Sequence, residues 1–169
     1  MTQASFRRYP RNSPQAAGRI LAMALLANGD VKAVEWQRLT DTKALDRLGL
    51  QDLHWDAVMD DLGHDLTAGA DAGEDGRVGG PTLAAWLGEV DDVDLQTLQI
   101  ELCVQVIEAD GEVDPGESLV LLAALEQWAL PMEERARLEP LVYGLDFQVM
   151  PRRARVDPGL AHGPGRCGY

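Results

Sequence analysis

The sequence predicts an all-α protein, a compact helical bundle of about seven helices built from two related helical-hairpin halves. Hydrophobic residues make up 46% of the chain but aromatic residues only 5%, and alanine and leucine, both strong helix formers, are frequent. Apolar residues recur at helical spacing in several segments, and a short motif occurs twice. A chain of 169 residues is long enough to bury one core, so we expect a single helical domain.

Three helices are expected in the first half of the chain. Ser13 is a favourable N-cap and Pro14 suits the first helical position, so the first helix should run from Pro14 to about Ala27. The apolar spacing predicts a second helix over about 32–47 and a third over about 52–67.

The second half begins after a Gly/Asp-rich loop at 68–80, whose five glycines and lack of apolar periodicity argue against a helix. The helices expected beyond it are a short one opening at Pro81, then 95–109, 115–129 and 131–143. The predicted domain therefore spans 13–150. We expect 1–12 to be a flexible basic arm and 151–169 a disordered basic tail.

The charge pattern limits the classes of partner. The net charge is −13, and because both ends are basic, the predicted domain is more acidic still. Such a surface repels phosphate backbones, so no nucleic-acid partner is expected and a basic protein surface fits better. No apolar run is long enough to insert into a membrane, and the two cysteines suggest neither a disulfide framework nor a metal site, which favours a reducing, cytoplasmic location.

The repeated motif lies at the turn of each half. "ALLANGDVKAVE" (24–35) aligns with "VIEADGEVDPGE" (106–117), which gives the shared pattern A-[ND]-G-[DE]-V-x-x-x-E. Gly29 thus corresponds to Gly111, 82 residues later, and Glu35 corresponds to Glu117. This match indicates an internal duplication.

A helix, an "ADG" turn, valine, glutamate and a further helix, used twice in an acidic all-α chain, resemble the tellurite-resistance TerB-like family of bacterial helical domains. The resemblance covers roughly 13–143 and depends mainly on "ADGEVDPGE". It implies a compact bundle of two related halves in the cytoplasm and a non-enzymatic role in tellurite or general stress resistance. It also implies metal-linked interaction with a protein partner, including one at the inner membrane.

The motif resembles the second half of a calcium loop. With Gly111 at the sixth position, Glu117 falls at the twelfth, where an EF-hand has its bidentate glutamate. The first position would be Val106, which lacks a carboxylate, so a complete EF-hand is not expected. The candidate metal ligands are therefore Asp110 and Glu117 with Asp30 and Glu35 from the other copy, for a divalent cation such as calcium.

A purely structural interpretation explains most of the same letters. Gly111 suits a left-handed turn, Val113 a hydrophobic staple, and Asp114 with Glu117 a capping box at the start of a helix. Asp110 alone has no such structural explanation. Whether any metal binds, and which one, stays open.

Two other classes of function remain alternatives. Asp60, Asp61 and His64 could join residues from elsewhere in a metal-dependent hydrolase, although a solvated acidic helix face is the more ordinary explanation. The chain could also be a plain helical adaptor without metal. No nucleophile motif surrounds a serine or cysteine, and the four tryptophans lie among apolar residues, which favours packing roles.

Overall fold

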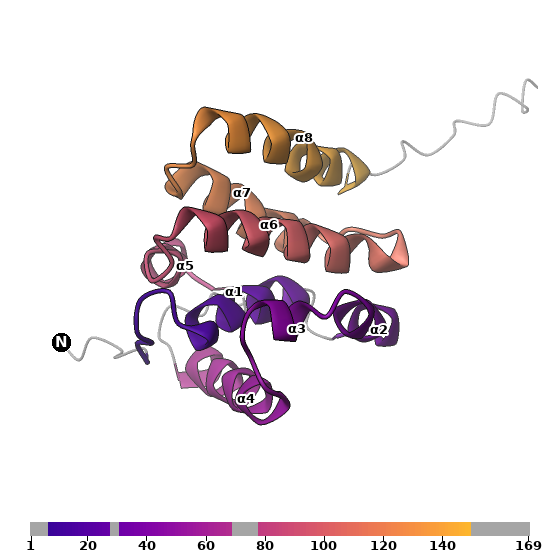
Figure 1. Cartoon of the computed structure of the whole chain (residues 1–169). Helices are drawn as coiled ribbons and strands as arrows, with labels where there is room; N and C mark the ends of the chain where they lie inside the picture. Colours follow the sequence, from indigo (N-terminus) through magenta and orange to yellow (C-terminus); the bar gives the residue numbers. More distant parts are fainter. Residues whose placement is uncertain (1–6, 28–30, 69–77, 150–169) are drawn as a thin grey trace, which may run out of the picture.

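The fold is described from a computed structural model over residues 7–27, 31–68 and 78–149. In these ranges the chain forms eight α-helices and one 3-10 helix, with no strand (Figure 1). The all-α prediction is confirmed. No helix among these residues is both long and apolar enough to cross a membrane.

The helices of the first half are α1 (Pro14–Leu26), α2 (Ala33–Asp41), α3 (Ala44–Arg47) and α4 (Asp52–Ala68). The second half contains α5 (Gly80–Leu87), α6 (Val93–Ile107), the 3-10 helix η1 (Glu108–Asp110), α7 (Pro115–Gln127) and α8 (Met132–Val149). Figure 1 shows α4 at one edge of the bundle and α8 at the opposite edge, with α1 and α6 between them.

The central helix is α1, which contacts α4, α6 and α7. Every residue from 16 to 25 is buried, and apart from Arg19 and glycine the stretch is entirely apolar. A helix that is apolar on all sides is stable in water only where other helices surround it. Both halves therefore pack around α1.

Two boundaries differ from the sequence prediction. The single helix expected over 32–47 is interrupted between α2 and α3, where Lys43 has a left-handed backbone with φ of 51°. The hydroxyl of Thr42 donates to the Arg38 carbonyl at 2.8 Å and helps to close α2. The last helix continues beyond the expected end at Tyr143, to Val149, and contains Pro140.

The end of α1 and the start of α7, which adjoin the two motif turns, lie beside one another. The start of α7 approaches the end of α1 so closely that a Cβ on Gly116 would come within 2.9 Å of the Ala27 carbonyl oxygen. The 3-10 helix η1 contacts α2. Glycine at this position thus lets the start of α7 pack directly on the end of α1.

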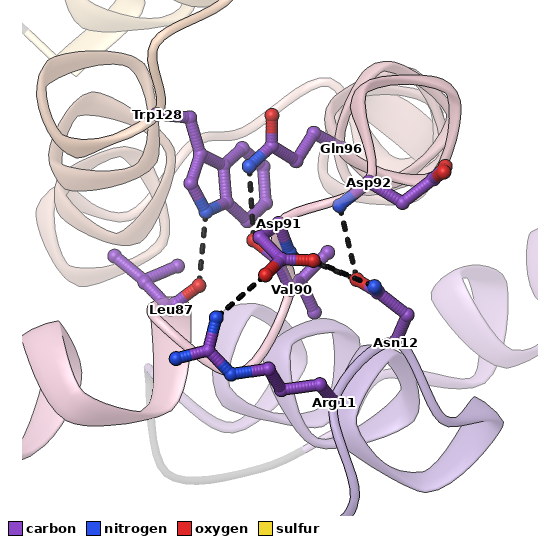
Figure 2. A network of polar contacts seen from close by, with 8 residues as sticks. All are labelled: Arg11, Asn12, Leu87, Val90, Asp91, Asp92, Gln96 and Trp128. Atoms are coloured by element: carbon purple, nitrogen blue, oxygen red, sulfur yellow. Dashed lines mark hydrogen bonds and ion pairs between the residues drawn. The ribbon is translucent and has the colours of Figure 1, made fainter.

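The first described residues bind the linker between α5 and α6, although we expected 1–12 to be a flexible arm. Arg11 pairs with Asp91 at 2.6 Å, and the Asn12 side-chain oxygen accepts from the backbone N–H groups of Asp91 and Asp92 at 2.8 and 3.0 Å (Figure 2). Figure 2 also shows the other side of this linker, where the indole of Trp128 donates to the Leu87 carbonyl at 3.0 Å.

Arg19 is the one charged residue in the buried stretch of α1, and its side chain is 1% exposed. Its guanidinium forms an ion pair with Glu89 and lies between the rings of Tyr9 and Trp86, at 4.6 and 4.5 Å from the ring centroids. Cation–π contacts of this kind stabilise a desolvated cation. We call Arg19, Glu89, Tyr9 and Trp86 the arginine cluster.

Three of the four tryptophans, Trp55, Trp86 and Trp128, are buried in the core, as the packing interpretation predicts. Trp36 is the exception, with 48% of its surface exposed on α2. The predictions for residues 1–6, for Asn28, Gly29 and Asp30, for most of the 68–80 loop and for the 151–169 tail lie outside the described residues.

Candidate functional site

The second turn has the local structure that its sequence predicts. Gly111 takes the left-handed conformation with φ of 74°, and Val113 is buried. The Asp114 side chain accepts from the Gly116 N–H at 2.8 Å, and Glu117 accepts from the Asp114 N–H at 3.0 Å. The capping box is confirmed.

The first turn repeats half of this arrangement. Glu35 accepts from the Lys32 N–H at 2.9 Å, as Glu117 does from Asp114. The N-cap residue of α2 is Lys32, whose side chain is a donor and therefore cannot cap as Asp114 does. The duplicated turns thus share the glutamate but differ in the N-cap residue.

The Lys32 side chain reaches across to the other copy. Its ammonium forms an ion pair with Asp110 and lies 3.9 Å from the Glu112 carboxylate. The second oxygen of Asp110 accepts from the Glu112 N–H at 2.9 Å. Asp110, for which the sequence suggested no local role, is therefore held both by its own turn and by a lysine from the first half.

The two capping glutamates form a carboxyl pair, and each is 1% exposed. Oε1 of Glu35 is buried and accepts no hydrogen bond from an N–H or hydroxyl group. Burial raises the pKa of Glu35, and the hydrogen bond from the Lys32 N–H acts in the opposite direction.

Glu117 has the more strongly raised pKa of the two glutamates. Burial and, to a smaller extent, the negative charge of Glu35 raise its pKa to about 7, although the hydrogen bond from the Asp114 N–H opposes them. At neutral pH Glu117 is therefore protonated for part of the time.

The ion pair shifts its own two groups toward their charged forms. The hydrogen bond to Asp110 is the main cause of the raised pKa of Lys32. Burial acts to raise the pKa of Asp110, but the Lys32 ammonium and the Glu112 N–H outweigh it and leave the pKa below its ordinary value. Both groups are charged at neutral pH.

The fold brings together three of the four residues predicted as metal ligands, namely Asp110, Glu35 and Glu117. Asp30 lies outside the described residues. In the described part of the chain, no group of three or more histidine, cysteine, aspartate or glutamate side chains is arranged to hold a metal ion. Metal binding by this set stays a prediction.

Lys32 is the member of this site that the motif comparison did not select. It occupies one of the variable positions of the shared pattern, opposite Asp114 in the alignment. A positive residue where the other copy has an acid is a signal of an ion pair between the copies, but it gives no indication of which acid is the partner.

The three residues of the hydrolase hypothesis do not form a common site. One has other partners, and the other two are exposed. Asp61 accepts from the Tyr9 hydroxyl at 2.9 Å and pairs with Arg7, so both of its oxygens are engaged. Asp60 and His64 are exposed on α4. Burial raises the pKa of the Cys103 thiol to about 12, so it is not a thiolate nucleophile at neutral pH.

Comparisons with protein-family models, curated proteins and solved structures give no match to this chain. The resemblance to the TerB-like family therefore depends on the repeated motif alone.

Proposed function

We propose that the chain is a TerB-like, non-enzymatic cytoplasmic protein that acts in tellurite or general stress resistance by binding a protein partner with a basic surface. The repeated motif, the all-α bundle and the acidic surface support this proposal. The partner is the part of the function for which the molecule offers a specific surface.

The observation that carries the proposal is a row of carboxylates on α4. Asp52, Asp56 and Asp60 are exposed and follow one another at four-residue intervals, so they lie on one face of the helix. The buried residues of α4 include Trp55, Val58 and Leu62. Among the described residues, none of the three acids takes part in an ion pair.

Such a row suits a partner that presents lysine or arginine side chains. Unpaired exposed carboxylates raise the rate of encounter with a basic surface, and this attraction weakens as salt screens it. The proposal does not require a metal, and the divalent cation predicted from the motif is a separate question.

Growth of the native host on tellurite tests the proposal. A strain that lacks the gene should be more sensitive than its parent, and the wild-type gene should restore resistance. The triple variant Asp52→Asn, Asp56→Asn and Asp60→Asn should fail to do so, because it keeps the buried face of α4 but removes the charges.

The matched control neutralises three exposed acids on other helices, with Asp94→Asn, Glu126→Gln and Glu133→Gln. It changes the net charge by the same amount and should restore resistance. Equal growth of the two triple variants would show that the α4 row has no special role, and unchanged sensitivity of the deletion strain would remove the assignment to tellurite resistance.

A further inference from the structure

We propose that Lys32 is a tethered cation that compensates the acidic site between the two motif turns, so that the wild-type protein needs no divalent metal there. This inference goes beyond the proposed function and is independent of the partner.

Each predicted ligand within the described residues already has a donor. Asp110 binds the Lys32 ammonium through one oxygen and the Glu112 N–H through the other. Glu35 and Glu117 each accept a backbone N–H at the start of their helices. A calcium ion takes six to eight oxygen ligands, and four of the six oxygens of these three carboxylates already accept a hydrogen bond, including the two bonds that begin α2 and α7.

The charges around Lys32 also oppose metal binding. Its ammonium forms an ion pair with Asp110 and lies 3.9 Å from the Glu112 carboxylate. A divalent cation would enter next to a fixed positive charge, and that repulsion opposes binding.

The duplication provides the third argument. The position that holds Lys32 in the first copy holds Asp114 in the second. Asp114 caps its own helix, whereas Lys32 leaves α2 without a side-chain cap and extends to the other copy instead. The first copy therefore lacks one local stabilising contact and has a cation directed at the shared site.

The test is a calorimetric titration with calcium, magnesium, manganese and zinc salts, made on the wild type and on Lys32→Met. At least one of these ions should bind Lys32→Met at least about tenfold more tightly than the wild type, because an uncompensated Asp110 then faces the two glutamates. The same ion should raise the thermal midpoint of the variant more than that of the wild type.

Three further variants make the result specific. Lys43→Met removes the only other lysine of the chain and should behave as the wild type. Lys32→Arg keeps the positive charge and should also behave as the wild type. Adding Asp110→Asn to Lys32→Met should abolish the new binding.

Wild-type binding as tight as that of Lys32→Met would overturn the proposal, as would a folded Lys32→Met protein that gains no binding at all. Circular dichroism of each variant establishes that it is folded. The growth assay on tellurite reports on the partner surface of α4, so failure of one proposal can be distinguished from failure of the other.

Discussion

The two polar clusters beside α1 differ in whether their charges depend on pH. The arginine cluster holds a guanidinium that is 1% exposed and is always charged, and it is closed by Tyr9 and Trp86. The cluster beyond the C-terminal end of α1 contains Lys32, whose side chain is 41% exposed, and Glu117, whose pKa is about 7. The buried Arg19 charge does not depend on pH, whereas the titration of Glu117 makes the stability of the fold depend on pH. We call Lys32, Asp110, Glu35 and Glu117 the titratable cluster.

The largest expected effect comes from removing the partner of the fixed charge. Glu89→Gln keeps the shape of the side chain but leaves Arg19 without a counterion, and a buried pair that loses one member typically costs about 3 kcal/mol or more of unfolding free energy. Urea denaturation at neutral pH measures the difference. A loss below 1 kcal/mol would mean that the stacked rings, rather than the ion pair, stabilise the guanidinium.

The second prediction concerns the titratable cluster. Glu117 has a pKa of about 7 in the fold and an ordinary value of 4.5, so between these two values the folded state holds a proton that the unfolded chain releases. Its contribution therefore favours the folded state on the acid side and is lost as the pH rises through 7. We expect the unfolding free energy to fall by roughly 2 kcal/mol between pH 5 and pH 8.

The control for this prediction is Glu117→Gln, since glutamine also serves at this position of a capping box. The variant should lose most of the fall in stability between pH 5 and pH 8, and Glu112→Gln, which changes an exposed neighbour, should keep it. An unchanged pH profile in Glu117→Gln would show that another group titrates.

The smallest effect is expected at the rim of the arginine cluster, where Arg11 pairs with Asp91 in an exposed position. The pair is open to solvent, so Arg11→Met should cost much less stability than Glu89→Gln. A salt series up to 1 M sodium chloride should weaken this contribution further and leave the Glu89→Gln loss largely unchanged. If the stability contribution of Arg11 did not depend on salt, this would contradict the expected difference between the exposed and the buried ion pair.

Local sequence signals predicted the features that involve near neighbours. Pro14, Gly111 and the Asp114 to Glu117 box are set by backbone rules that operate within a few residues, and the structure has each of them where expected. The duplication aligned Glu35 with Glu117, and the structure shows that both accept a backbone N–H at the start of a helix.

Contacts between distant segments could not be predicted in the same way. An arginine within an apolar helix is usually on the rim, and nothing near Arg19 in the sequence identifies Glu89 as its partner. The ion pair of Lys32 with Asp110 joins the two copies and depends on how they pack. The break at Lys43 was missed because its left-handed backbone has no glycine to signal it.

Trp36 gives the titratable cluster an optical reporter. It follows Glu35 directly on α2 and is the one half-exposed tryptophan, while the other three are shielded in the core. Acrylamide should therefore quench its emission selectively, and a quenching titration over pH, metal or partner would observe this corner of the molecule without any attached dye.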